Sequence, residues 1–127
     1  MAVAALTAWH VAHESARRAA ADAVLPAHAR VETYSVLTRI PPPHRLAPAF
    51  VAELLERRFP AADTVAPSAA LSRELVGRCG EHGVAGGAVY DALVGLTARE
   101  ADILLLTRDE RAARTYERVG VPFRLMR

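Results

Sequence analysis

Apolar residues recur every three or four positions along most of the chain, which is the spacing of amphipathic or buried helices. In the first half this pattern predicts helices over residues 3–23, 27–40 and 48–59. Three prolines at 41–43 end the second helix, and Pro48 opens the third. Proline fits the first turn of a helix but not its interior, so these boundaries are well defined by the sequence.

Short apolar runs separate the helical segments in the second half of the chain. Helices are predicted over residues 71–83, 88–99 and 108–119, and strands over residues 64–66, 103–106 and 121–126. The run at 103–106 is apolar without a break, so we expect a strand that is buried on both faces. Helices that alternate with short buried strands indicate an α/β fold with a mainly parallel sheet.

Capping residues predict where three of these helix ends lie. Ser68 is a predicted N-cap, because a serine hydroxyl can accept a hydrogen bond from a free N–H of the first turn. Gly80 and Gly83 are predicted to end that helix, and Gly120 is predicted to end the last one, since glycine adopts the left-handed conformation that follows many helices.

The composition narrows the class of protein. The 127 residues suit a single domain over residues 1–127. One cysteine, Cys79, excludes an internal disulfide and fits a reducing cytoplasm. No apolar run approaches the roughly 18 residues of a membrane span, and the N-terminus lacks the basic start of a signal peptide. We therefore expect a soluble, cytoplasmic protein without a membrane partner.

The charge of the chain says little about its binding partners. All 16 basic residues are arginine, and the formal net charge is +2. This excess is too small to indicate nucleic-acid binding by itself. It is compatible with RNA, because the guanidinium group matches the geometry of phosphate.

Asp109 is the first candidate for chemistry. It follows the predicted strand at 103–106, and ligands of open parallel sheets bind at the carboxyl ends of the strands. Thr107 and Glu110 fit a capping box, which predicts Thr107 as the helix cap and leaves Asp109 in the first turn. The structural alternative is that Asp109 itself caps the helix.

Asp91 is the second candidate. Its helix is predicted to bury Val89, Leu93 and Leu96, which places Asp91 on another side with Gly87 and Gly95 one turn away in each direction. Glycine inside a helix costs up to about 1 kcal/mol relative to alanine. Either an open site for metal and substrate or close packing of helices would explain that cost, and the sequence favours neither.

Glu32 is the third candidate. Apolar residues spread around much of the circumference of its helix, so we expect this helix to be largely buried. A buried carboxylate must be paired, neutralised or bound to a metal. Arg30 and Arg39 are the alternative partners in an ion pair. Together, the three acids predict a site for Mg²⁺ or Mn²⁺, which prefer carboxylate oxygens and water.

Three segments containing these acids resemble one family. Residues 26–39 resemble the helix of the second acid in PIN-domain toxins of the VapC type, residues 87–93 resemble the helix of the third acid, and residues 106–109 resemble the last acidic strand end. The three segments occur in the order of the family, and the resemblance extends from about residue 3 to the C-terminus.

The resemblance implies a three-layer α/β/α fold and a Mg²⁺-dependent endoribonuclease of a toxin–antitoxin system. It implies that Glu32, Asp91 and Asp109 are catalytic and hold the metal, with Mn²⁺ as an alternative, and that Thr107 orients substrate phosphate or the last acid. The implied partners are a VapB-type antitoxin, an RNA substrate such as transfer or ribosomal RNA, and a second copy of the chain.

One departure from the family concerns the N-terminus. The family begins with a central strand that ends in an aspartate, and residues 1–10 resemble the helix after that strand. Asp22 lies too far along the helix to substitute. We expect that the start was assigned too late, the other explanation being a truncated copy. The alternative function is therefore an impaired PIN-fold remnant that only binds an antitoxin or RNA.

The histidines near the N-terminus do not match a known zinc-binding motif. His10, His13 and Glu14 lie within one helical turn, but their order matches neither H-E-x-x-H nor H-x-x-E-H. We interpret them as a surface cluster.

Overall fold

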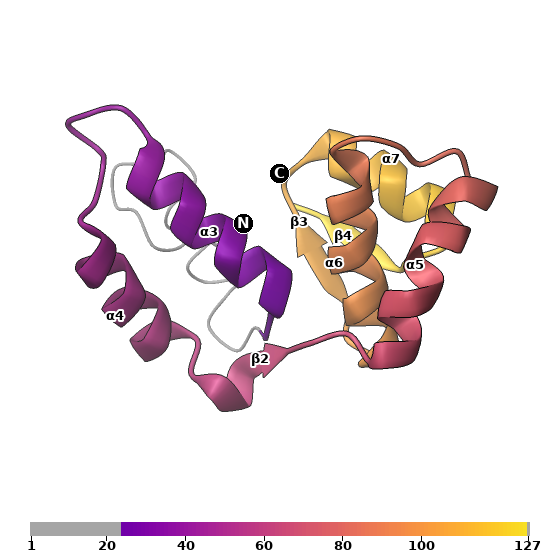
Figure 1. Cartoon of the computed structure of the whole chain (residues 1–127), viewed down its shortest axis with the longest axis horizontal. Helices are drawn as coiled ribbons and strands as arrows, with labels where there is room; N and C mark the ends of the chain where they lie inside the picture. Colours follow the sequence, from indigo (N-terminus) through magenta and orange to yellow (C-terminus); the bar gives the residue numbers. More distant parts are fainter. Residues whose placement is uncertain (1–23, 127) are drawn as a thin grey trace. The chain divides into compact units, whose positions relative to one another are not determined.

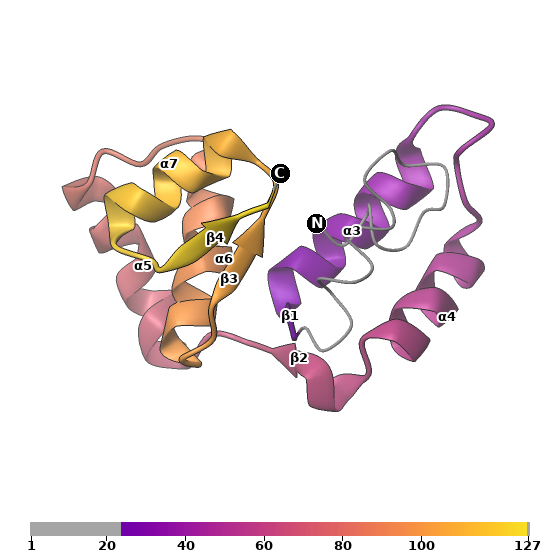
Figure 2. The same ribbon diagram turned by 180° about the vertical axis from the view of Figure 1, so that it is seen from behind.

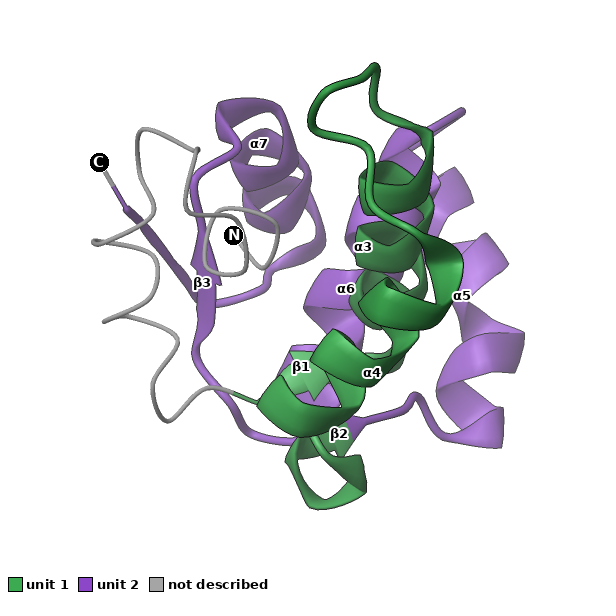
Figure 3. Ribbon diagram, turned by 90° about the vertical axis from the view of Figure 1, so that its left-hand side faces the viewer, with its two compact units in different colours: residues 1–64 green, residues 65–127 purple. Residues whose placement is uncertain are grey.

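The computed structural model describes residues 24–126, which fall into two compact units. Residues 24–64 belong to unit 1 and residues 65–126 to unit 2 (Figure 3). Each unit is described by itself. Several predictions concern residues outside this range: the helix over residues 3–23, its histidine cluster, the position of Asp22 and the lack of a first strand. The prediction of a single domain over residues 1–127 stays a prediction.

The described part of unit 1 contains two α-helices that pack against each other. Its described elements are β1 (Leu25–Pro26), α3 (Ala27–Arg39), α4 (Pro48–Arg58), the 3-10 helix η1 (Ala61–Asp63) and β2 (Thr64–Val65), whose second residue is the first of unit 2. The strands β1 and β2 form a two-stranded sheet. The helices over 27–40 and 48–59 were thus predicted to within one residue.

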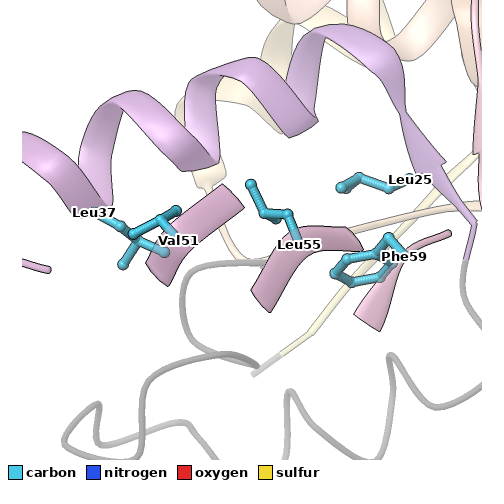
Figure 4. Close-up of a cluster of buried hydrophobic side chains, with 5 residues drawn as sticks. All are labelled: Leu25, Leu37, Val51, Leu55 and Phe59. Atoms are coloured by element: carbon cyan, nitrogen blue, oxygen red, sulfur yellow. The ribbon is translucent and has the colours of Figure 1, made fainter. Parts of the chain in front are cut away.

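A small apolar core joins α3 to α4. It consists of Leu25, Leu37, Val51, Leu55 and Phe59, and it lies between the two helices and β1 (Figure 4). Val51 and Leu55 of α4 and Phe59 at its C-cap follow the spacing of four that places side chains on one face of a helix. Each of the five is buried, so the cluster forms an apolar contact between α3 and α4.

Unit 2 consists of three helices and a parallel strand pair. Its elements are α5 (Ala69–Glu81), α6 (Ala88–Glu100), β3 (Leu105–Thr107), α7 (Glu110–Val119) and β4 (Phe123–Leu125). The pairing of β3 with β4 is parallel and places Leu105 opposite Phe123 and Thr107 opposite Leu125. The helix α6 packs against α5, α7 and β3, so it is the central element of the unit (Figures 1 and 2). An α/β fold with short parallel strands was the predicted class.

Two predicted helix ends have the expected chemistry. The Ser68 hydroxyl caps α5 by accepting a hydrogen bond from the Leu71 N–H at 3.0 Å. Gly120 ends α7 in the left-handed region, with φ of 74°. Gly80, in contrast, lies inside α5, so the prediction that it ends this helix was wrong. Gly83, at φ of 65°, lies just beyond the helix.

The predicted strand at 103–106 begins two residues later than expected. Leu104 is 48% exposed and precedes β3, so the prediction of a strand buried on both faces was wrong. The first and last residues of β3, Leu105 and Thr107, are buried, whereas Leu106 between them is half-buried. Thr107 is therefore a strand residue rather than a helix cap.

Glu100, the last residue of α6, links this helix to the start of α5. Its Oε2 accepts a hydrogen bond from the Ser68 hydroxyl at 2.6 Å, and its Oε1 accepts one from the Ser68 N–H at 2.7 Å. The side-chain hydrogen bond first, and then the backbone one, lower the pKa of Glu100 below its ordinary value of 4.5. Glu100 therefore stabilises the folded chain above its unfolded pKa, and this contribution is lost as the pH falls through the folded pKa.

Glu100→Gln is expected to lower the midpoint of thermal unfolding slightly at neutral pH. The difference from the wild type should shrink as the pH falls from 4.5 through the lowered folded pKa of Glu100, because the side chain then becomes protonated in the folded chain as well. Glu81→Gln is the matched control, since Glu81 is the last residue of α5 and its side chain has no hydrogen-bond partner among residues 24–126. A difference that stays constant from neutral to acid pH would contradict this role.

Candidate active site

Asp109 is the N-cap of α7. Its Oδ1 accepts hydrogen bonds from the backbone N–H groups of Arg111 at 2.8 Å and Ala112 at 3.3 Å. The prediction that Thr107 caps this helix and leaves Asp109 in the first turn was wrong, and the structural alternative holds. Oδ2 has no hydrogen-bond partner in the part of the chain that the structure describes. The carboxylate is exposed, so this oxygen is open to a ligand.

Thr107 supports the turn that leads into Asp109. It is buried in β3, and its Oγ1 accepts a hydrogen bond from the Asp109 N–H at 3.1 Å. Its carbonyl oxygen accepts another from the Met126 N–H at 2.7 Å, next to β4. These contacts fix the backbone on which Asp109 stands. The predicted role of Thr107 towards substrate stays a prediction.

Asp91 lies in the first turn of α6 and is half-buried. Its two glycine neighbours have different surroundings. A Cβ atom at Gly87 would meet nothing within 4 Å, whereas one at Gly95 would lie 2.7 Å from Cδ1 of Tyr116. Close packing therefore explains Gly95, whereas packing does not require a glycine at position 87. The explanation by an open site for metal and substrate stays a prediction.

Asp91 and Asp109 lie at the same end of unit 2. A short connection joins α6 to β3, and the two run in opposite directions, so α6 begins where β3 ends and α7 begins (Figures 1 and 2). The carboxyl end of β4 is at this end too, because its pairing with β3 is parallel. The partial positive charge of a helix N-terminus stabilises a carboxylate, and both acids benefit from it.

Glu32 is on α3 in unit 1, and its surroundings differ from the prediction. The side chain is 51% exposed, so the expectation of a buried carboxylate was wrong. Its Oε1 lies 2.9 Å from Nε2 of His28, one helical turn earlier. The Glu32 side chain makes no other hydrogen bond or ion pair with residues 24–126, which leaves Oε2 without a partner there.

Neither arginine proposed as an ion-pair partner contacts Glu32. Arg30 instead pairs with Glu56 at 2.7 Å and donates to the carbonyl oxygens of Leu55 and Phe59 at the end of α4. This arginine caps a helix C-terminus, where a cation is favourable. The partner that sequence reasoning missed is His28, although its spacing of four residues from Glu32 identifies it as a neighbour on one face.

The described residues contain no group of three His, Cys, Asp or Glu side chains placed to hold a metal ion. Two of the predicted ligands belong to unit 2 and Glu32 belongs to unit 1. The convergence of all three carboxylates therefore stays a prediction, whereas the shared location of Asp91 and Asp109 is a feature of one unit.

Comparison with known proteins identifies the class and then the family. The model of the PIN domain matches residues 1–118. The chain is 50% identical over 129 residues to ribonuclease VapC40 of Mycobacterium tuberculosis, which covers 98% of this chain and 92% of the relative. It is 45% identical over 123 residues to ribonuclease VapC27 of the same species, covering 95% and 88%. No solved structure matches significantly.

The chain belongs to the VapC family of PIN-domain ribonuclease toxins. The predicted resemblance is thereby confirmed, and so is the predicted α/β class with short parallel strands. Among the described helices, none has the length and apolar character needed to cross a bilayer.

Proposed function

We propose that this chain is a Mg²⁺-dependent endoribonuclease that hydrolyses RNA phosphodiester bonds at Asp91, Asp109 and Glu32. Mn²⁺ is an alternative cation. The observation that supports this assignment most is the shared location of Asp91 and Asp109 at the end of unit 2 where β3 and β4 end (Figure 1). This is where open parallel sheets bind their ligands.

The donor atoms fit such a cation. Mg²⁺ keeps several waters and binds one or two carboxylates directly, together with substrate phosphate. Oδ2 of Asp109 and Oε2 of Glu32 have no partner among residues 24–126, so each can accept a cation or its bound water. A bound divalent cation supplies the charge that activates water and stabilises the leaving oxygen in phosphodiester hydrolysis.

The protein groups have the remaining tasks in this proposal. Backbone N–H groups of Arg111 and Ala112 hold Oδ1 of Asp109, so the carboxylate is oriented before a ligand arrives. His28 orients Glu32 in the same way through Oε1. Ligating carboxylates are commonly held by hydrogen bonds of this kind, and such partners tune the affinity of the site.

The family supports the proposed biological setting. A VapB-type antitoxin would bind the toxin and block the site, the substrate would be structured RNA such as transfer or ribosomal RNA, and the toxin would act in the cytoplasm as a homodimer. The relatives are named ribonucleases, which supports RNA as the substrate of this chain.

The test is a Mg²⁺ titration of RNA cleavage by the wild type, Asp91→Asn and Asp102→Asn. We expect no cleavage in EDTA, and we expect Asp91→Asn to require roughly ten-fold more Mg²⁺ or more for half-maximal cleavage. Asp102→Asn is the matched control. Asp102→Asn removes the same charge just beyond the C-terminal end of α6. Asparagine tolerates the positive φ of 56° at position 102.

Three outcomes would count against the proposal. Cleavage that persists in EDTA would exclude a metal-dependent reaction. Equal Mg²⁺ dependence in the wild type and Asp91→Asn would remove Asp91 from the site. Absence of cleavage in every form, with antitoxin binding retained, would instead favour the impaired binding protein.

A further inference from the structure

We propose that Arg111, Arg114 and Arg118 on α7 form a track that binds the phosphates of the RNA strand next to the cleaved bond. The choice of RNA rests on the proposed function. The track itself rests on the geometry of α7, on the pairing state of its arginines and on its position immediately after Asp109.

The three arginines occupy one side of α7. They are spaced by three and four residues, so their side chains leave the helix in neighbouring directions. The opposite side is formed by the buried residues Ala112, Ala113, Thr115, Tyr116 and Val119. At ~1.5 Å of rise per residue, the arginines extend over about 10 Å of helix. All three are exposed.

These guanidinium groups remain available for a ligand. The guanidinium groups of Arg111 and Arg114 have no hydrogen bond or ion pair with any residue from 24 to 126. Arg118 donates one Nη1 hydrogen bond to the Gly83 carbonyl at 3.2 Å, which leaves most of its five donors unused. A guanidinium group binds phosphate through two parallel hydrogen bonds, so each arginine suits one phosphate.

The glutamates of α7 define the edge of the track. Glu110 and Glu117 lie four residues before and three residues after Arg114, at spacings that commonly form ion pairs on helices. Neither forms one within the described part of the chain. Successive residues turn by about 100°, which places both glutamates beside Arg114 and away from Arg111. A polyanion would therefore lie on the side of Arg111 and Arg118.

The track starts at the candidate active site. The N–H of Arg111 is bound to Oδ1 of Asp109, so the first arginine is anchored to a proposed metal ligand. An RNA strand with a phosphodiester at Asp109 would meet Arg111 first and then Arg114 and Arg118 along α7. This continuity with a phosphodiester-cleaving site is why we favour RNA over an acidic protein segment as the ligand.

The test measures the binding of a labelled single-stranded RNA in EDTA, where cleavage is prevented, over a series of salt concentrations. For single strands the slope of log K against log salt changes by about 0.7 for each phosphate contact. We expect each of Arg111→Gln, Arg114→Gln and Arg118→Gln to reduce the slope by that amount, and the triple variant to reduce it by about 2.

Arg73→Gln is the matched control. Arg73 is exposed on α5 and its guanidinium group has no hydrogen bond or ion pair with residues 24–126, so its replacement removes the same charge from another helix of the same unit. Its slope should remain that of the wild type. Glutamine is a good helix former, and thermal unfolding of each variant, followed by circular dichroism, verifies that the fold is retained.

The possible outcomes test the arginine track independently of the proposed function. A slope in the triple variant equal to that of Arg73→Gln would overturn the track, even if Asp91→Asn proves Asp91 essential. A reduced slope in the triple variant would support the track even if the chain does not cleave RNA. An unchanged RNA slope together with lost binding of a poly-glutamate peptide would overturn the track in favour of an acidic protein partner.

Discussion

Asp109→Asn is expected to lower Mg²⁺-dependent RNA cleavage on the order of 100-fold while changing the free energy of unfolding by only a few tenths of a kcal/mol. Asparagine and aspartate are about equally good N-caps, because the side-chain oxygen that accepts the hydrogen bonds is present in both. The replacement therefore keeps the bonds to the N–H groups of Arg111 and Ala112 and removes the negative charge.

Asp109→Ala is the companion variant that separates the two roles of this residue. It removes both the charge and the cap, so cleavage should fall as in Asp109→Asn and the free energy of unfolding should fall by about 1 kcal/mol as well. Cleavage assays and urea unfolding of the two purified variants measure both quantities. Full cleavage by Asp109→Asn would show that Asp109 is only a helix cap.

The cap of α7 illustrates where sequence reasoning is ambiguous. Thr107 and Asp109 are both good N-cap residues, and each offers a consistent local pattern. Parallel pairing decides between them, because β3 extends through Thr107 to pair with Leu125 of β4. That pairing joins segments far apart in the sequence, so local patterns could not reveal it.

The elements whose ends depend on local chemistry were predicted well. The proline-bounded helices α3 and α4, the serine cap of α5 and the left-handed Gly120 all follow from the preferences of one or two residues. The positions of Asp91 and Asp109 near helix starts were predictable for the same reason. Their shared location at one end of unit 2 followed from the expected parallel sheet.

The exposure of Glu32 was not predictable from periodicity. Apolar residues surround α3, but the residues that become buried are Thr33 and Leu37, four positions apart. Val31 is 64% exposed and Tyr34 is 37% exposed. Composition around a helix does not show which stripe meets its neighbour, and here α4 and β1 contact only one side. Glu32 lies on the exposed side of α3.

Gly95 is the position in unit 2 with the least space for a side chain. A Cβ atom there would lie 2.7 Å from Cδ1 and 3.0 Å from Cε1 of Tyr116, and 3.2 Å from Cγ2 of Val121. Tyr116 and Val121 are both buried, and the Tyr116 ring also contacts Phe123 at a centroid distance of 5.7 Å. A rigid ring held on several sides has little room to move away.

Gly95→Ala is therefore expected to lower the free energy of unfolding by about 1–3 kcal/mol, because overpacking outweighs the gain of up to about 1 kcal/mol that alanine gives in a helix. Gly77→Ala is the matched control, since Gly77 lies inside α5 with nothing within 4 Å of a Cβ atom. It should raise the stability by up to about 1 kcal/mol. Urea unfolding of both variants should thus show shifts of opposite sign. Equal shifts would mean that α6 and α7 separate enough to admit a methyl group, and that the tight contact at Gly95 does not fix the spacing of the helices on which Asp91 and Asp109 stand.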